Sequence, residues 1–445
     1  MIHNTLVLFG ATGDLTQRKL LPALWNGAQH HRFDGLHILG IGRKPWGTEG
    51  FRQKAKEACK PEKEDTEKWQ AFEKSLEFSQ TDVENDASFD ALCQQLDRKE
   101  NLLFMLAMAP ELYPPITQRI AKIQNSGFKR VMIEKPFGHD LASAHQLNAL
   151  LKKHFGEQVY PIDHYLGKST VRNIMVLRFS NPVFEPVWNR KYVESVQIIH
   201  SEQQGIGHRV DFYDQTGALR DMVQSHLLQM LARVAMEPPE VFDTWHVAQE
   251  KAKVLKNLEP SPEVVFGQYD GYAQEVGHES RTETFVALKA FVRTPRWKGV
   301  PFYLMTGKKL KDKFAEVIIT FKPIDYMGQA TQKDTLTITL QPDEKFALSV
   351  NLKEIGQTEL KSFKMEYCQS CDVKTSAPQN YEILFQEALL GKKTFFASWR
   401  EIEACWKFVE AVQAKVKGQK PVKYAPGSKG PAAAAHITDW NDYVG

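Results

Sequence analysis

Short apolar runs alternate with amphipathic stretches along roughly the first third of the chain. Four of these runs predict buried strands, at residues 4–10, 36–42, 101–110 and 129–136. The pattern between and after them predicts helices at 15–30, 111–125 and 141–154, and a solvated helix or loop at 59–69. Buried strands separated by helices are typical of a parallel sheet covered on both faces. We therefore expect an N-terminal α/β domain of the doubly wound, Rossmann type.

The pattern changes after about residue 175, where strand-like runs follow one another with partial alternation. They occur at 192–202, 283–292, 301–307, 315–323, 334–342 and 346–353. Helices are predicted at 219–236, 381–390 and 398–416. This order predicts an α+β domain built on a large, mostly antiparallel sheet. We expect two domains, a dinucleotide-binding domain at 1–175 and a substrate-binding and dimerisation domain at 176–445.

Composition narrows the class of protein without naming a function. The 445 residues are 42% hydrophobic and 25% charged, which is ordinary for a soluble globular protein. The net charge of +3 gives no strong field that would indicate nucleic acid or a membrane surface as partner. No apolar run approaches the roughly 18 residues of a membrane span, and residues 1–10 do not resemble a signal peptide. We expect a cytoplasmic protein.

The five cysteines are too few and too scattered for a disulfide framework. Cys368 and Cys371 form one CxxC pair, but no second ligand pair stands at zinc-site spacing near it. The surrounding residues also do not resemble a thioredoxin-like unit. We expect an incidental pair and no metal site.

The segment "GATGDL" follows the first predicted strand and opens the first predicted helix. Glycine lets a backbone turn sharply against a pyrophosphate, and a helix N-terminus offers free N–H groups to it. The spacing departs from GxGxxG, and a tight turn before any helix would also contain glycine. Its place after the first strand favours dinucleotide binding, with Thr12 as either a phosphate donor or a helix cap. The candidate residues are Gly10, Thr12, Gly13, Asp14 and Leu15.

The second predicted strand ends in "GIGRKP". An NAD-specific protein usually has an acidic residue here for the ribose 2′-hydroxyl. Arg43 and Lys44 instead suit the 2′-phosphate of NADP, although two solvated charges would give the same pattern. We expect NADP as cofactor, with NAD possible as a secondary coenzyme.

A candidate base lies on the predicted helix at 219–236. His226 shares the apolar face of this helix with Met222 and Met230, so it points towards packed structure. A core histidine would show the same pattern. Histidine also suits removal of a hydroxyl proton near neutral pH, and Asp163 of "PIDHYLGK" is a candidate to orient its ring.

The chain resembles the glucose-6-phosphate dehydrogenase family in segments spread along its length. They are "GATGDL" (10–15), "EKPFG" (134–138), "IDHYLGK" (162–168), "FEPVWNR" (184–190), "RDMVQSHLLQMLARVAMEPP" (220–239), "GVPFYLMTGKKL" (299–310) and "YAPGSKGP" (424–431). The pair "IDHYLGK" and "SHLLQ" is the most specific part of this resemblance.

The resemblance implies a role for each matching residue. His164, Tyr165 and Lys168 would bind the 6-phosphate of the substrate, and Asp163 would pair with the catalytic base His226. Glu202 and Asp221 would accept hydrogen bonds from sugar hydroxyls, and Lys135 would lie between substrate and coenzyme. Lys308 and Lys313 would stand at the substrate's far side, and Thr12 and Arg43 would contact coenzyme phosphates.

The implied reaction oxidises β-D-glucose 6-phosphate to 6-phosphoglucono-δ-lactone and reduces NADP, in a homodimer or homotetramer. Two other interpretations are open: another two-domain sugar oxidoreductase, and a catalytically silent sensor of sugar phosphate or NADP.

The chain departs from the family at Pro161, where arginine is frequent, and at Gly207 and His208, where a glutamate is missing. We expect modest changes in loop order or affinity. The short chain also leaves a second, structural NADP site in doubt. The Lys135–Pro136 bond is a candidate cis peptide, with trans favoured by frequency alone.

Overall fold

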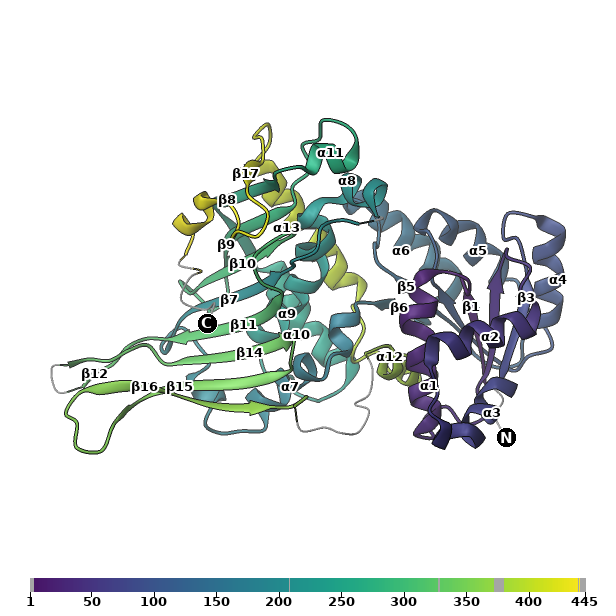
Figure 1. Cartoon of the computed structure of the whole chain (residues 1–445), viewed down its shortest axis with the longest axis horizontal. Coiled ribbons are helices and arrows are strands. Elements are labelled where there is room, and N and C mark those ends of the chain that lie inside the picture. Colours follow the sequence, from purple (N-terminus) through teal and green to yellow (C-terminus); the bar gives the residue numbers. More distant parts are fainter. Residues whose placement is uncertain (1–3, 208, 327–328, 372–379, 439, 441–445) are drawn as a thin grey trace. The chain divides into compact units, whose positions relative to one another are not determined.

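The computed structural model describes the chain except residues 1–3, 208, 327–328, 372–379, 439 and 441–445 (Figure 1). The chain forms two compact units. The first comprises Met1–Lys168 and Ser376–Trp399, and the second comprises Ser169–Thr375 and Arg400–Gly445. The main division falls seven residues before the boundary that the sequence pattern placed after residue 175. Ser376–Trp399 belongs to the first unit, although the pattern placed it in the second domain.

The first unit is built on a six-stranded sheet in which all neighbouring strands are parallel. Its order is β3 (Leu76–Gln80), β2 (His37–Gly42), β1 (Asn4–Phe9), β4 (Asn101–Leu106), β5 (Lys129–Glu134) and β6 (Val159–Ile162). Helices flank the sheet, as Figure 1 shows. The expected doubly wound fold is confirmed. The prediction missed β3 and β6, the two edge strands, and β6 contains Pro161, which an edge strand tolerates.

The helices of the first unit follow their strands in sequence order. They are η1 (Thr16–Leu20), α1 (Leu21–Gln29), α2 (Gly47–Cys59), α3 (Thr66–Lys74), α4 (Asp86–Leu96), α5 (Tyr113–Ile120) and α6 (Leu141–Phe155). The charged stretch at 59–69 thus leads into α3, whose buried residues are Trp69 and Phe72.

Helix α12 (Asn380–Leu390) completes the first unit from far along the chain. Its apolar residues join the core that contains Leu6, Leu8 and Leu24. The Asn26 amide donates to Glu382 at 2.5 Å, and Arg32 forms an ion pair with the same carboxylate. These polar contacts compensate the burial of Glu382, which is fully inaccessible.

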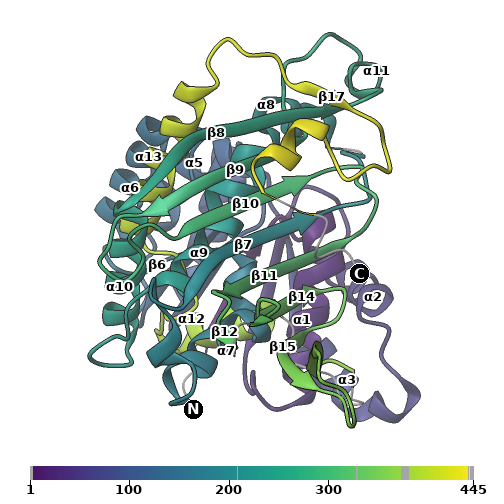
Figure 2. The same ribbon diagram turned by 90° about the vertical axis from the view of Figure 1, so that its left-hand side faces the viewer.

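The second unit is built on a nine-stranded sheet, seen broadside in Figure 2. Its order is β16 (Leu360–Cys368), β15 (Lys345–Lys353), β14 (Thr335–Gln341), β11 (Phe314–Phe321), β7 (Val193–Ser201), β10 (Pro301–Gly307), β9 (Phe285–Val292), β8 (Leu258–Tyr269) and β17 (Val422–Tyr424). The β7–β10 and β8–β17 pairs are parallel and the others antiparallel. The expected α+β fold with a mostly antiparallel sheet is confirmed. A separate two-stranded sheet pairs β12 (Asp325–Tyr326) with β13 (Gln329–Ala330).

Helices of the second unit pack on this sheet. They are α7 (Ser169–Phe179), α8 (Val210–Ala218), η6 (Leu219–Leu227), α9 (Leu228–Ala235), α10 (Thr244–Lys256), α11 (Tyr272–Val276) and α13 (Trp399–Lys415). The predicted helix at 219–236 is η6 followed by α9, and η6 has π-helical geometry. Because η6 packs against β7 and β10, the central strands of the sheet support it.

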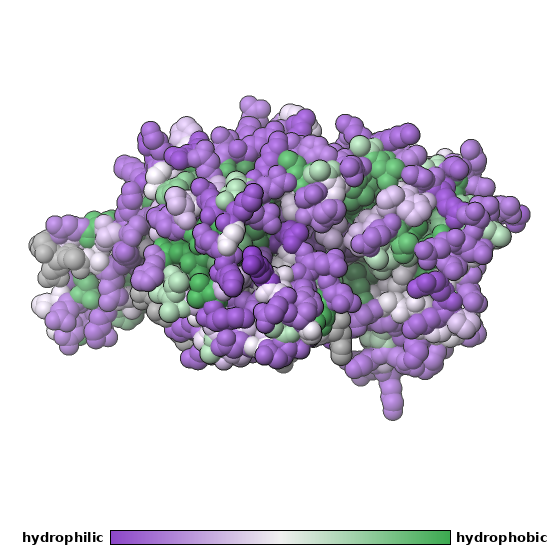
Figure 3. Space-filling model, turned by 90° about the horizontal axis from the view of Figure 1, so that it is seen from above, coloured by the Kyte–Doolittle hydropathy of each residue, from purple (hydrophilic) through white to green (hydrophobic). Residues whose placement is uncertain are grey.

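Polar side chains cover most of the face seen in Figure 3, with hydrophobic residues in small separate groups. None of the described helices combines the length and the apolar character that a membrane crossing requires.

Candidate active site

The "GATGDL" loop of the first unit lies at the carboxyl end of β1. Gly10 has a φ of +79°, and a Cβ atom there would lie 2.1 Å from the carbonyl oxygen of Ala107. The N–H groups of Gly10 and Ala11 donate to Ile41 O at 3.1 and 3.0 Å, which ties the loop to β2. Both the positive φ and the close backbone require glycine at position 10. The loop therefore leaves β1 without side-chain bulk, as close approach of a pyrophosphate requires.

The cations expected to bind the 2′-phosphate follow β2. Arg43 and Lys44 are both exposed, and Thr12 packs against Gly42 at the end of the same strand. Because β1 and β2 are parallel neighbours, their carboxyl ends share one edge of the sheet. The loop and Arg43 thus lie at the edge where open α/β sheets bind ligands.

The "IDHYLGK" segment follows β6 at this same edge. Asp163 is 1% exposed, and its Oδ1 accepts a hydrogen bond from Tyr165 N at 3.0 Å. This contact begins the short helix η4 (His164–Gly167), and the Lys168 Nζ then lies 5.0 Å from the centre of the Tyr165 ring. The helix η4 therefore holds the tyrosine and the lysine close together.

A tyrosine that the sequence analysis did not single out supports this segment. The Tyr381 ring of α12 lies parallel to the His164 imidazole, with centroids 6.3 Å apart. Its hydroxyl donates to the carboxylate of Glu134, next to Lys135. Burial raises the pKa of Glu134 to about 7, while the Tyr381 hydrogen bond and the Lys135 charge oppose the rise. Tyr381 thus joins the segment after β6 to the "EKP" segment after β5.

The Lys135–Pro136 peptide bond is cis, and the expectation of a trans bond from frequency alone is wrong. The trans preference of an Xaa–Pro bond is only about 0.5–1 kcal/mol, so the surrounding fold can select either isomer. A second cis bond joins Gln341 and Pro342.

The candidate base lies in the second unit on η6. His226 is 2% exposed and Asp221 is 6% exposed, so this helix buries an imidazole and a carboxylate. The apolar stripe correctly placed His226 towards packed structure. Its expected partner, Asp163, belongs to the first unit, and the pairing stays a prediction.

Charged residues from three elements gather around Tyr213 of α8. Glu202, which follows β7, forms an ion pair with Lys308, which follows β10. The Lys308 Nζ lies 5.5 Å from the centre of the Tyr213 ring, and Asp221 and Glu202 both raise the pKa of Tyr213, after the larger effect of burial. Arg209 donates to Asp221 at 3.4 Å. The second unit thus brings Glu202, Asp221 and Lys308 together around Tyr213, and their contacts with a substrate stay predictions.

Lys313, Gly207 and His208 were also singled out from the sequence, and none of them is seen among the described residues of this cluster. Lys313 is exposed immediately before β11, and the structure shows no contact between it and Glu202 or Asp221 within the described residues. Gly207 has a φ of +57° and lies in an exposed loop, and His208 lies outside the described residues.

Glu283 is a further residue that the sequence analysis did not single out, and it anchors the start of η6. Its Oε1 accepts a hydrogen bond from Leu219 N at 2.9 Å, at the first residue of the helix. A Cβ atom on Gly217, which has a φ of +70°, would lie 2.5 Å from this carboxylate. Glycine at 217 therefore lets Glu283 reach the helix end that leads to Asp221 and His226.

Glu283 gives the fold a measurable pH dependence. Burial raises the pKa of its carboxyl from 4.5 to about 6, against the opposing hydrogen bond from Leu219. The folded chain therefore binds this proton more tightly than the unfolded chain, and the ionised carboxylate costs stability as the pH rises through this interval. Glu283→Gln removes the ionisable group, so its stability should not fall in this way. The difference in free energy of unfolding between Glu283→Gln and wild type should therefore grow by up to about 2 kcal/mol from about pH 4.5 to pH 8. Urea denaturation at both pH values measures the free energies of unfolding. The same difference between variant and wild type at both pH values would contradict the expected ionisation of Glu283.

Comparison with known proteins places the whole chain in one group. Two family models match it: "Glucose-6-phosphate dehydrogenase, NAD binding domain" at residues 7–173 and "Glucose-6-phosphate dehydrogenase, C-terminal domain" at 175–443. The glucose-6-phosphate 1-dehydrogenase of Bacillus subtilis (strain 168) is 39% identical over 464 residues, covering 96% of this chain and 94% of the relative.

Solved structures agree with this comparison. A glucose-6-phosphate dehydrogenase in complex with its substrate glucose-6-phosphate superposes with a TM-score of 0.89 at 29% identity, covering 98% of this chain and 97% of the other. The glucose-6-phosphate 1-dehydrogenase of Mycobacterium avium gives 0.87 at 31% identity, covering 98% and 96%. The chain belongs to the glucose-6-phosphate dehydrogenase family.

Proposed function

We propose that the chain oxidises β-D-glucose 6-phosphate to 6-phosphoglucono-δ-lactone and reduces NADP⁺, the first step of the oxidative pentose phosphate pathway. The observation that carries this proposal is that one unit of a chain of this family holds a buried His226 and Asp221 on η6 and the Glu202–Lys308 ion pair. Such a cluster supplies a base and hydrogen-bond partners for a polyhydroxylated substrate.

The residues at the carboxyl edge of the first sheet fit NADP. Because a Cβ atom at position 10 would clash with Ala107 O, glycine keeps the loop tight against the sheet. Gly10, Thr12, Gly13, Asp14 and Leu15 would surround the pyrophosphate. When bound, the nicotinamide accepts hydride from C1 of the sugar. Arg43 would bind the 2′-phosphate, and Lys135 would contact both coenzyme and substrate.

The sugar phosphate is assigned to the segment after β6. His164, Tyr165 and Lys168 supply imidazole, hydroxyl and ammonium groups, and the close approach of Lys168 to Tyr165 concentrates donors for a phosphate. A neutral sugar would need no such set of donors.

The chemical step is assigned to His226. It would remove the proton of the C1 hydroxyl, and Asp163 would fix its tautomer and stabilise the imidazolium. Glu202, Asp221, Lys308 and Lys313 would hold the remaining sugar hydroxyls and so orient C1 towards the coenzyme.

Arg43 should set the coenzyme preference. We expect Arg43→Ala to lower kcat/KM for NADP roughly tenfold, because a charge-assisted hydrogen bond to the 2′-phosphate is lost. The kcat/KM for NAD should change little. Lys56→Ala is the matched control, because it removes an exposed cation of α2 that has no expected coenzyme contact. Equal losses with both coenzymes in Arg43→Ala would remove Arg43 from the 2′-phosphate site.

Tyr213 should contact the substrate through its hydroxyl. The side chain is 1% exposed, and among the described residues no group hydrogen-bonds to this hydroxyl. An unpaired buried hydroxyl beside Glu202 and Lys308 is explained by a sugar hydroxyl that pairs with it. We expect Tyr213→Phe to raise KM for glucose 6-phosphate roughly threefold to tenfold and to leave KM for NADP unchanged. Steady-state kinetics measure both constants, and an unchanged KM for the sugar phosphate would contradict the contact.

A substrate panel separates the proposed function from its alternatives. With NADP, the enzyme should oxidise glucose 6-phosphate and show little turnover of unphosphorylated glucose. Preference for glucose would favour another sugar oxidoreductase. Binding of glucose 6-phosphate without coenzyme reduction would favour a silent sensor.

The assembly is proposed to be a homodimer, or a homotetramer built from dimers, in the cytoplasm. Support comes from the free edge of the nine-stranded sheet, where β16 exposes 55% of Met365 and 63% of Tyr367. Burial of these side chains against a second copy would remove apolar surface from water. Light scattering of wild type and Met365→Glu tests this assignment, because the variant should shift the population towards monomer.

A further inference from the structure

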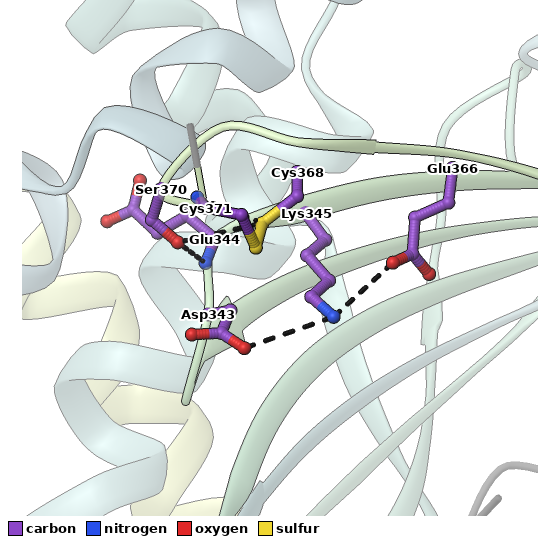
Figure 4. Close-up of a disulfide and its surroundings, with 7 residues drawn as sticks. All are labelled: Asp343, Glu344, Lys345, Glu366, Cys368, Ser370 and Cys371. Carbon is purple, nitrogen blue, oxygen red and sulfur yellow. Dashed lines mark hydrogen bonds and ion pairs between the residues drawn. A yellow bond between two sulfur atoms is a disulfide. The ribbon is translucent and has the colours of Figure 1, made fainter. Parts of the chain in front are cut away.

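Cys368 and Cys371, which the sequence analysis expected to be an incidental pair, are joined by a disulfide at the end of β16 (Figure 4). The bond closes a tight loop that contains Gln369 and Ser370. The loop is fixed to the turn between β14 and β15, because Gln369 N donates to Glu344 O at 2.8 Å and Glu344 N donates to Ser370 Oγ at 2.9 Å.

The disulfide loop and Glu344 together hold the first turn of α7. The Glu344 carboxylate accepts hydrogen bonds from Ser169 Oγ at 2.9 Å and Thr170 N at 3.0 Å, so it caps the helix N-terminus. The Gln369 amide donates to Ser169 Oγ at 2.8 Å and accepts from Asn173 Nδ2 at 3.1 Å. Gln369 inside the disulfide loop and Glu344 in the turn between β14 and β15 thus contact the same helix end.

The first residue of α7 directly follows Lys168, the lysine assigned to the substrate phosphate. We propose that Cys368 and Cys371 form a reversible disulfide site that tunes affinity for the sugar phosphate through the first turn of α7. In the disulfide form, the closed loop keeps Gln369 and Ser370 in place against Ser169 and Glu344. Reduction releases the loop, loosens this turn, and weakens the hold on Lys168. The link to the sugar phosphate rests on the proposed function.

The sulfur atoms are placed for exchange with a dithiol. Cys371 is exposed and Cys368 is half-buried, so a thiolate of a dithiol reductant reaches the Cys371 sulfur first. The S–S bond then breaks and the electron pair goes to Cys368 Sγ, which already accepts the Cys371 N–H at 3.1 Å. Attack by the second thiol of the reductant on the mixed disulfide leaves two protein thiols and one oxidised dithiol.

The other three cysteines are poor competitors in this exchange. Cys405 is buried, and burial raises the pKa of Cys59 to about 12 and that of Cys93 to about 11. Because the thiolate is the reactive form, these thiols react slowly near neutral pH. Redox changes under mild conditions should therefore be confined to Cys368 and Cys371.

The first experiment equilibrates the full-length enzyme in buffers of reduced and oxidised dithiothreitol, followed by alkylation and peptide mass mapping. Cys368 and Cys371 should be alkylated together in the reducing buffer and protected together in the oxidising buffer. Hydrogen–deuterium exchange should show lower protection of residues 169–173 in the reduced enzyme. Failure of the pair to change state together, or equal protection of α7 in both buffers, would overturn the proposal.

The second experiment measures kinetics in the same two buffers. Reduction should raise KM for glucose 6-phosphate roughly threefold to tenfold, the effect of losing about one hydrogen bond, and leave kcat and KM for NADP unchanged. Cys371→Ser and Gln369→Ala should have the raised KM in both buffers, whereas the control Cys93→Ser should keep the full response. A redox-independent KM in active wild type would overturn the link to the sugar phosphate. Absence of turnover in both buffers would instead contradict the proposed function. The hydrogen–deuterium exchange of residues 169–173 would then test the reversible disulfide without the kinetics.

Discussion

Replacing His226 with asparagine should lower kcat by roughly 10²–10⁴-fold, the usual contribution of a positioned general base. Asparagine is a polar side chain of similar reach, so the buried position on η6 should keep its local structure. It cannot accept a proton at neutral pH, and the C1 hydroxyl would have to lose its proton to water. The affinity for glucose 6-phosphate should remain near that of wild type, because the residues proposed to bind the phosphate are His164, Tyr165 and Lys168.

The control for this variant is Gln224→Ala, which changes a neighbouring buried residue of η6 that cannot act as a base. Calorimetric titration gives the affinity for the sugar phosphate, and steady-state rates give kcat. A kcat in His226→Asn within a few-fold of that of wild type would show that another residue removes the proton. A joint loss of affinity and kcat would indicate a structural role.

Replacing Lys168 with alanine should raise KM for glucose 6-phosphate by roughly 10–100-fold. Hydrogen bonds to charged groups contribute about 1.5–3 kcal/mol, and we propose that the lysine supplies one to the phosphate. Tyr165 and His164 would remain, since η4 begins at the Asp163 cap and does not depend on the lysine side chain. The kcat at saturating substrate should change less than KM.

Lys153→Ala is the matched control, because it removes an exposed lysine of α6 and the same formal charge. Raised ionic strength should also weaken binding to wild type more than to Lys168→Ala. An unchanged KM in Lys168→Ala would remove this residue from the phosphate site and leave His164 and Tyr165 as the remaining candidates.

The sequence pattern predicted the central strands of both sheets and missed the strands at or near their edges. Central strands such as β1 and β4 are buried on both faces and are continuous apolar runs, which periodicity detects. The edge strands β3, β6 and β16 carry polar or proline residues, because one side of each lacks a neighbouring strand. β8 begins with prolines and charges and has a register shift between Pro260 and Val264, which disguises its pattern.

The position of α12 could not be obtained from local pattern. Its helical character was correctly predicted, but its packing on the first unit depends on contacts with residues far away in sequence, such as Asn26 and Arg130. Tyr381 therefore looked like an ordinary helix residue, although its hydroxyl bonds Glu134. The only sequence signal for this contact was Glu134 itself, a carboxylate at the end of a predicted buried strand, which needs a hydrogen-bond partner.

The candidate site was predicted in parts. The motifs named Glu202, Asp221 and Lys308, and the structure brings them together. Tyr213 and Glu283 were missed because their roles follow from an unpaired hydroxyl and a helix-end contact, neither of which has a fixed spacing in sequence. The CxxC spacing was noticed, but its contacts with α7 arise only because β15 and β16 pair.

The most direct test of the account is the initial rate of coenzyme reduction with glucose 6-phosphate, followed by the near-ultraviolet absorbance of the reduced nicotinamide. Wild type and His226→Asn should be compared with NADP and with NAD. The account predicts rapid reduction of NADP by wild type and a rate lower by roughly 10²–10⁴-fold in the variant. A wild-type enzyme that binds glucose 6-phosphate but reduces neither coenzyme would contradict it.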